Sequence, residues 1–190
     1  TADYYYKKTT DLLNTVSLPS SSGYKSTVRN IGSISNQGVE LLIEGDVVQN
    51  KDFGLTLQFN IAHNKNRVEE LADGKDILGT TYSNYGSGSI TIIREGEPLG
   101  AFYVYKDTGL DENGSLSYED MNGDGQYTDT EDRYIAGSPF PDFTYGLNCG
   151  IRYKNWDFNF FLQGSQGNDV FNLSEMRNYS YGQGMNIERK

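Results

Sequence analysis

Two runs of alternating residues, joined by Lys154 and Asn155, constrain the fold of this chain more than any other feature. Within residues 143–153, and again within residues 156–163, every second position is apolar or aromatic. These positions are Phe143, Tyr145, Leu147, Cys149, Ile151 and Tyr153 in the first run, and Trp156, Phe158, Phe160 and Leu162 in the second. Because successive side chains of a strand point to opposite faces of a sheet, the pattern predicts an antiparallel hairpin with one apolar and one polar face.

The first run has the length of a membrane-spanning strand. Its eleven residues, at roughly 3.3 Å each and tilted by about 45°, would span about 25 Å, the height of the apolar band of an outer-membrane barrel. A second ribbon of the same design follows from residues 39–47 and 55–61, where Val39, Leu41, Ile43, Val47, Leu55, Leu57, Phe59 and Ile61 are the apolar members. The apolar faces therefore meet either lipid or a second layer of protein.

Short and long connections alternate along the chain. Residues 49–52 and 154–155 form short turns, whereas residues 10–37 and 66–142 form long links. Within the first link, the Ser-rich stretch 17–35, with Pro19 and Gly23, is predicted to be a loop. In an up-and-down meander this alternation places all short turns at one end, which is the arrangement of bacterial outer-membrane proteins.

The chemistry of the two faces also favours a membrane protein. The polar faces are rich in Asn, Gln, Thr and Gly, and Tyr153, Trp156 and Phe158 cluster near a short turn, where an interfacial aromatic girdle would lie. We therefore predict an all-β fold of antiparallel up-and-down strands forming part of a large transmembrane β-barrel with long extracellular loops. Since alternation alone fits a soluble β-sandwich as well, that fold is the alternative.

Residues 66–142 are predicted to be one long extracellular loop within residues 1–190. An extra hairpin is expected there from the strand-like segments 90–94 and 101–106, and residues 120–132 resemble a calcium-binding loop. Five membrane strands cannot close a barrel, and Thr1 stands almost at the start of a strand-like run, so the chain is expected to be a fragment of a longer one.

Composition narrows the function classes. The 15 Tyr and 22 Gly favour strands and turns over helices, and no window approaches the roughly 18 consecutive apolar residues of a membrane-spanning helix. The net charge of -10 is concentrated in residues 95–132, which hold eleven acidic residues and one base, Lys106. Because no basic patch is present, nucleic acid is not an expected partner. With His63 as the only histidine and no nucleophile or phosphate-binding motif, the chain is not expected to be an enzyme.

The acidic segment contains one motif with a defined chemistry. Residues 120–131 fit D-x-[DN]-x-[DN]-G-x5-E, the pattern of an EF-hand calcium loop. In such a loop alternate side-chain oxygens converge on the ion, a glycine permits the sharp turn, and a final carboxylate closes the site. The candidate ligands are Asp120, Asn122, Asp124, the backbone carbonyl of Gln126, and either Glu131 or Asp132. Hard oxygen ligands select Ca²⁺, which is expected to pin the long loop. An Asp- and Gly-rich turn without metal is the alternative.

Aromatic residues in the long link are candidates for stacking on sugar rings, although such residues more often pack a loop. These candidates are Tyr82, Tyr85, Phe102 and Tyr103. If the sheet is instead a sandwich, the alternative function is that of a secreted, calcium-stabilised β-sandwich that binds glycans.

Several blocks of the sequence together resemble the SusC/RagA-type TonB-linked outer-membrane proteins. They run in the family's order over nearly the whole chain, which makes the resemblance specific. The blocks are Thr27 to Gly32 followed by Asn36 to Leu41, then Arg94 to Gly100, Asp120 to Gly125 leading to Asp132 and Arg133, Gly137 to Phe143, and Phe161 to Ser165. The spacing from Gly125 to Asp132 is one residue longer than in many members, which leaves the last metal ligand open between Glu131 and Asp132.

This resemblance implies a bacterial outer-membrane barrel of about 22 strands, filled by an N-terminal plug and driven by TonB. A SusD-like surface lipoprotein would cover it, and the cargo would be oligosaccharides or, in some members, peptides. The chain would correspond to a late portion of the barrel wall, without the plug and the segment that contacts TonB. Its lipid-facing side would meet the outer-membrane lipid.

Overall fold

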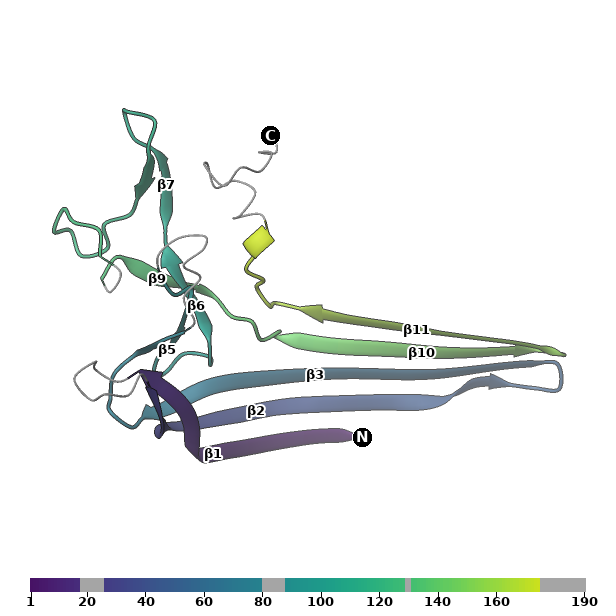
Figure 1. Ribbon diagram of the computed structural model, residues 1–190. Helices are drawn as coiled ribbons and strands as arrows, with labels where there is room; N and C mark the ends of the chain where they lie inside the picture. Colours follow the sequence, from purple (N-terminus) through teal and green to yellow (C-terminus); the bar gives the residue numbers. More distant parts are fainter. Residues whose placement is uncertain (18–25, 80–87, 129–130, 175–190) are drawn as a thin grey trace.

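The computed structural model describes residues 1–17, 26–79, 88–128 and 131–174 (Figure 1). Eleven strands lie in these ranges: β1 (Ala2–Ser17), β2 (Ser26–Gln49), β3 (Phe53–Leu71), β4 (Ile77–Leu78), β5 (Thr91–Ile93), β6 (Ala101–Tyr105), β7 (Asp107–Leu110), β8 (Leu116–Tyr118), β9 (Arg133–Gly137), β10 (Phe143–Tyr153) and β11 (Trp156–Gln166). They form a long sheet in the order β1-β2-β3-β10-β11, a small sheet β4-β5-β6-β9, and the pair β7-β8. Among the described residues, no helix has the length and apolarity needed to cross a membrane.

The long sheet is antiparallel throughout, and the predicted hairpins form two of its ribbons. β10 pairs with β11 from Phe143 opposite Gln166 to Tyr153 opposite Trp156. On its other edge β10 pairs with β3, so the two ribbons lie side by side. Their short turns lie at the same end (Figure 1), where the Lys154 N–H donates to the Asp52 carbonyl over 2.7 Å. The two predicted short turns and the long link between β3 and β10 are present, whereas most of the predicted long link 10–37 belongs to β1 and β2.

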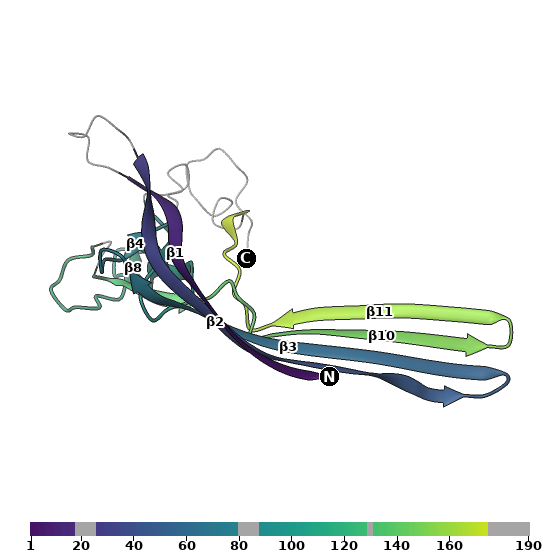
Figure 2. The ribbon, with the colours of Figure 1, turned by 90° about the horizontal axis from the view of Figure 1, so that it is seen from below.

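The prediction of a loop at residues 17–35 was wrong for residues 17 and 26–35, which are strand, and residues 18–25 lie outside the described residues. β1 continues to Ser17, and β2 begins at Ser26, so these two strands pair far beyond the start of the apolar alternation. The β1–β2 register shifts at a bulge, where Gly32, at φ 134°, is paired with Leu12, and Asp11, at φ 57°, lies in the shift between Thr9 and Leu12. A bulge lets one extra residue enter a strand while pairing resumes on either side. The polar sequence therefore bends the strands instead of ending them (Figure 2).

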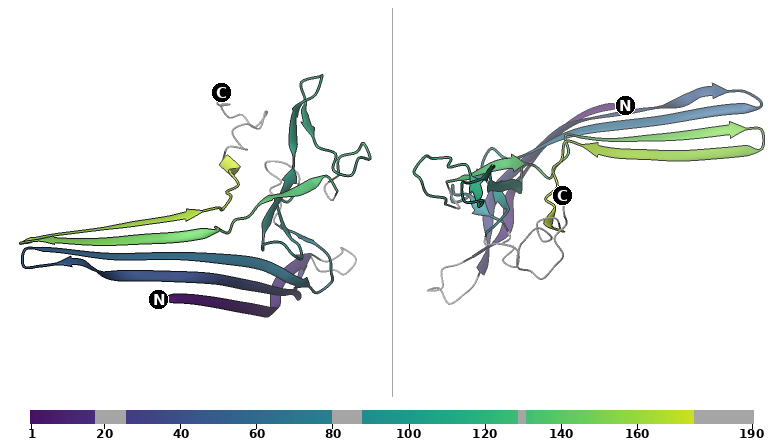
Figure 3. Two further views of the ribbon diagram at one scale, coloured as in Figure 1. Left: turned by 180° about the vertical axis from the view of Figure 1, so that it is seen from behind. Right: turned by 90° about the horizontal axis from the view of Figure 1, so that it is seen from above.

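The small sheet lies beyond the end of the long sheet that is opposite the short turns (Figures 2 and 3). The two segments predicted as an extra hairpin appear as β5 and β6, which pair from Thr91 opposite Phe102. Its core contains Ile92, Ala101 and Tyr103, with Ile135 of β9 packed against them. A turn at residues 111–115 connects β7 to β8.

The segment between β5 and β6 docks onto the end of β3. The Gly96 N–H donates to the Val68 carbonyl over 2.9 Å, and the Val68 N–H donates to the Glu97 carbonyl over 2.9 Å. Glu95 accepts the Leu71 N–H over 2.7 Å, and buried Asn66 accepts the Leu99 N–H over 2.8 Å. Residues 94–100 thus hold the small sheet against the long one.

Candidate functional site

The long sheet exposes a continuous apolar face across all its strands. Paired positions on adjacent strands point to the same side, so Ile43, Phe59 and Leu147 form one cross-strand row. The exposed members of this face are Tyr4, Tyr6, Val39, Ile43, Val47, Phe143, Tyr145, Tyr153, Trp156, Phe158 and Leu162. Trp156 is 78% exposed, and Phe158 is 60% exposed. In the described ranges no second layer covers this face (Figures 1 and 3). A patch of this extent is far larger than soluble monomers normally leave in water.

The opposite face of the same strands carries amide, hydroxyl and carboxyl groups. Gln58 of β3 donates to Glu44 over 3.2 Å, and Thr56 donates to Asp46 over 2.7 Å, so polar groups of adjacent strands are bonded across the surface. Asn148, Asn159 and Gln163 continue this polar face on β10 and β11. Apolar residues interrupt it, among them Leu42, which is paired with Asn60, and Phe161, which is 60% exposed.

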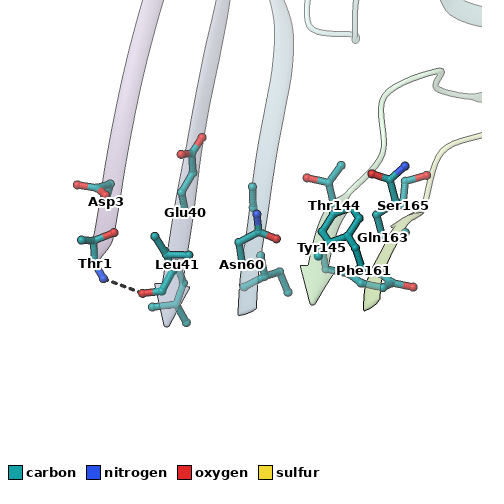
Figure 4. A pocket seen from close by; sticks show the side chains of 15 residues that line it. Thr1, Asp3, Glu40, Leu41, Asn60, Thr144, Tyr145, Phe161, Gln163 and Ser165 are labelled. Carbon is teal, nitrogen blue, oxygen red and sulfur yellow. Dashed lines mark hydrogen bonds between the residues drawn. The ribbon is translucent and has the colours of Figure 1, made fainter. Parts of the chain in front are cut away.

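A hollow of about 780 Å³ lies on the polar side, between the middle of β3 and the ends of β10 and β11 that are away from their short turn; Figure 4 shows its side chains. Side chains from neighbouring strands line it, among them Asp3, Glu40, Asn60, Thr144, Phe161 and Gln163. Gly146 forms part of its floor, because a Cβ at this position would lie 2.6 Å from the Asn60 Oδ1 atom and 3.3 Å from the Phe161 ring. The absence of a side chain at residue 146 therefore lets the Phe161 ring lie across β10.

The acidic loop 120–132 is curled on itself by hydrogen bonds from its own backbone. The Asp120 carboxylate accepts the N–H groups of Gly123 and Gly125 over 2.6 Å and 2.7 Å. Asn122 Oδ1 accepts the Asp124 N–H over 3.0 Å, and Asp124 Oδ1 accepts the Gln126 N–H over 2.7 Å. Three side chains predicted as metal ligands therefore already turn inward, in the first half of the loop.

The two candidates for closing this loop have different environments. Asp132 is fully buried, and its oxygens accept the N–H groups of Met121 over 3.0 Å and Thr128 over 2.7 Å. The Thr128 N–H is the main reason that the pKa of Asp132 lies below its ordinary value, despite the opposing effect of burial. Exposed Glu131 instead accepts a hydrogen bond from Asn122 over 3.1 Å. Asp132 therefore joins the two ends of the loop, whereas Glu131 is bonded to Asn122, which is itself a ligand candidate.

No three His, Cys, Asp or Glu side chains in the described ranges come close enough together to hold a metal ion. The predicted ligand set also includes the amide of Asn122 and the carbonyl of Gln126. The calcium site therefore stays a prediction.

The four aromatic residues predicted to stack on sugar rings lie in different environments. Tyr103 is 2% exposed and belongs to the core of the small sheet, with the Arg94 guanidinium 4.9 Å from its ring centre, so a ligand has no access to it. Phe102 is half-buried, and its ring centre lies 6.4 Å from that of Phe171. Tyr82 and Tyr85 lie outside the described residues.

A single-layer antiparallel sheet with one apolar and one polar face is the architecture of an outer-membrane barrel wall. Comparisons with known proteins point to the same class, although no protein-family profile matches the chain. The chain is 37% identical over 189 residues to TonB-dependent receptor P3 of Formosa agariphila, which covers 90% of the chain and 19% of that relative. It is 35% identical over 178 residues to TonB-dependent receptor SusC of Bacteroides thetaiotaomicron, covering 89% of the chain and 18% of SusC.

Among solved structures, the RagAB peptide transporter superposes with a TM-score of 0.72 at 26% identity, covering 88% of this chain and 18% of that one. The chain thus spans about a fifth of the length of the curated relatives it matches. The resemblance stated from sequence is confirmed: the chain is homologous to part of the SusC/RagA-type TonB-dependent receptors. The predicted fold class is confirmed as well, with the described strands forming an open portion of such a transporter barrel.

Two features of the site were not identified from sequence, although both left a signal. Phe161 is the one large apolar residue at a polar-face position in its run, and Gly146 is its near neighbour across the β10–β11 pair. The role of Asp132 in joining the two ends of the loop is harder to predict from sequence, because only the folded loop brings its carboxylate to the N–H group of Met121.

Proposed function

We propose that this chain forms part of the barrel wall of a bacterial outer-membrane, TonB-dependent transporter that imports nutrients. The apolar face meets acyl chains, and the polar face lines the inside of the barrel. The protein moves its cargo without chemical change, so it is not an enzyme.

The observation that carries this proposal is the uncovered apolar face of the long sheet. Burial of apolar surface stabilises by roughly 25 cal/mol per Å², so a sheet in water would cover these side chains with a second layer. In lipid the same side chains need no protein partner, and closure of the barrel satisfies the strand edges. The alternative, a β-sandwich that binds glycans, requires a second sheet packed on this face, and none of the described strands lies there.

The relatives support a finer version of the proposal. One relative is named SusC, and the superposed structure is of the RagAB peptide transporter. We therefore propose oligosaccharides or peptides as cargo and a SusD-like surface lipoprotein as partner, with TonB engaging a part of the longer protein outside this chain.

Deletion of the gene in its host tests the transport function. The deletion strain is grown on a panel of oligosaccharides and on peptides as sole nutrients, with the wild-type gene restored as control. We expect growth to fail on one nutrient class and to recover on restoration, with the protein in the outer-membrane fraction and a lipoprotein copurifying in mild detergent. Unchanged growth on every nutrient together with recovery of the protein in the soluble fraction would contradict the proposal.

We propose further that Ca²⁺ binds the loop 120–132 through Asp120, Asn122, Asp124, the Gln126 carbonyl and Glu131. The inward turn of the first three side chains supports this assignment. Because both oxygens of Asp132 already accept backbone N–H groups, Glu131 is the better candidate for the closing ligand.

Calorimetry of the full-length protein tests the calcium proposal. We expect Ca²⁺ uptake at millimolar concentration or below, with slower hydrogen exchange across residues 107–137. Asp120→Asn should weaken uptake strongly, and Glu131→Gln should weaken it more than Asp132→Asn does. The exposed polar-face variant Asn148→Asp is a control that should leave it unchanged. No uptake of Ca²⁺ by the wild type would refute the site.

A further inference from the structure

We propose that Asp132 and Arg133 are positioning residues that link the acidic loop 120–132 to the small sheet, so that ordering of the loop also orders residues 88–93. The proposal deepens the calcium assignment made above and rests on it for its trigger, whereas the link itself rests on contacts within the chain. The small sheet lies beyond the end of the long sheet opposite the short turns (Figure 1), which is the outer side of the proposed transporter. Ca²⁺ outside the cell would then control the order of the transporter's outer surface.

Both linking residues are buried by this chain alone. Asp132 has an exposed fraction of 0%, and Arg133 one of 9%. Their side chains contact different parts of the molecule, since Asp132 is bonded to the loop and Arg133 to the small sheet. The peptide unit between them is therefore held from both sides, and a displacement on one side is passed to the other.

On the loop side, Asp132 is held by backbone groups at both ends of the loop. Its carboxylate accepts the N–H groups of Met121 and Thr128, and its own N–H donates to the Thr128 carbonyl over 3.3 Å. If the loop opened while Asp132 stayed in place, a buried carboxylate would lose its donors, which is costly. Asp132 must therefore move into water when the loop opens, and Arg133 moves with it.

On the side of the small sheet, the Arg133 guanidinium holds the segment before β5 against β6. It donates to the Ser89 carbonyl over 2.5 Å, and it lies 4.7 Å from the ring centre of Tyr105, the residue paired with Arg133 on β6. Gly88, at φ 129°, permits this approach, because a Cβ there would lie 2.6 Å from the Arg133 Nη2 atom. The position of residues 88 and 89 thus depends on that of Arg133.

A row of aromatic rings connects the same two regions. The ring of Tyr127, in the loop, has its centre 6.2 Å from that of Tyr118 on β8, and the ring of Tyr118 has its centre 5.3 Å from that of Tyr105. Tyr105 in turn lies under the Arg133 guanidinium. The loop and the small sheet are therefore joined by packing as well as by the chain at residues 132–133.

Hydrogen exchange of the full-length protein in detergent tests the link from the loop side. Asp132→Ala leaves two backbone N–H groups without their acceptor, so we expect exchange about tenfold faster or more at residues 88–93 as well as in the loop. Asp111→Ala is the matched control, because the exposed Asp111 carboxylate also accepts two backbone N–H groups, in the turn between β7 and β8. It should change exchange in that turn and leave residues 88–93 as they are.

The reverse direction is tested from the small sheet. Coupling between two sites is reciprocal, so Gly88→Ala, which displaces the buried guanidinium, should speed exchange of the loop 120–132 by about fivefold or more. Gly74→Ala is the control, since Gly74 also has a positive φ, of 60°, and a Cβ there meets nothing within 4 Å. It carries the same kind of backbone strain without the contact and should leave the loop unchanged. This readout also decides the question if Asp132→Ala does not fold.

Ca²⁺ separates the link from its trigger. In the wild type, Ca²⁺ should slow exchange both in the loop and at residues 88–93, whereas in Arg133→Ala it should slow exchange in the loop alone. A wild type in which Ca²⁺, Asp132→Ala and Gly88→Ala each change exchange on their own side only would overturn the link and leave the calcium site standing. No response to Ca²⁺, with both variants still acting across the link, would refute the calcium site and its control while confirming the link.

Discussion

The long sheet and the small sheet contain similar apolar residues, but the small sheet buries them and the long sheet exposes them. In the small sheet, Ile92, Ala101 and Tyr103 are buried against one another. In the long sheet, Phe158 and Leu162 are 60% and 58% exposed, although they belong to an equally regular apolar pattern. The small sheet can satisfy its apolar groups internally, whereas the long sheet needs an apolar solvent on one side. The difference indicates that two environments, water and lipid, act on one chain.

The largest expected effect is a loss of stability in the small sheet. Ile92→Ala removes a fully buried side chain and should lower the free energy of unfolding of the small sheet by about 2–5 kcal/mol. Leu78, its partner on β4, is largely exposed, so Leu78→Ala is the matched control and should cost less than about 1 kcal/mol. Hydrogen exchange of residues 91–105 in the full-length protein measures both. Equal effects would show that the small sheet has no core of its own.

A charge on the apolar face tests the lipid-facing part. Leu147→Arg, near the middle of β10, should cost about 2–4 kcal/mol in a bilayer. Its neighbour Asn148 lies on the polar face, so Asn148→Arg should have little effect. Urea unfolding of the full-length protein from lipid vesicles measures the difference. Similar costs at the two positions would mean that the faces do not meet different solvents.

A substitution at the junction between the two sheets should have an intermediate effect on stability. Asn66→Ala removes the acceptor of the Leu99 N–H and the donor to Asn36 Oδ1, at 2.8 Å and 2.9 Å. Because Asn66 is buried, the loss should be about 1–3 kcal/mol. Asn148→Ala, at an exposed site of the same sheet, is the control. We expect faster hydrogen exchange at residues 94–100 and no change in the rest of the long sheet. Unchanged exchange at residues 94–100 would show that Asn66 does not hold this segment on β3.

The smallest effect belongs to an exposed ion pair at the edge of the small sheet. Arg94 and Asp76 lie 2.8 Å apart, and both side chains are partly open to solvent. Asp76→Asn should therefore cost only about 0.2–1 kcal/mol, and less as salt is added. Thermal unfolding at low and high salt checks this. A larger, salt-independent loss would place the pair in the structural core.

Local pattern predicted the long sheet well, since alternation and turn spacing are properties of neighbouring residues. β10 has the predicted bounds, 143–153, and the short turns lie where expected. The prediction failed at residues 26–35, because pairing of β2 with β1 overrides the local preference of Ser and Gly for loops. Non-local contacts were also out of reach: the docking of residues 94–100 on β3 and the burial of Tyr103 depend on which distant segments meet.

Whether the two faces of the long sheet meet different solvents can be tested by measuring the exposure of two adjacent residues to lipid. Phe158→Cys and Asn159→Cys, each made without Cys149 and any other cysteine, are labelled with a fluorophore in the full-length protein and placed in vesicles of brominated lipid. We expect strong quenching at position 158 and little at position 159. Equal quenching at both positions, or stronger quenching at 159, would contradict it.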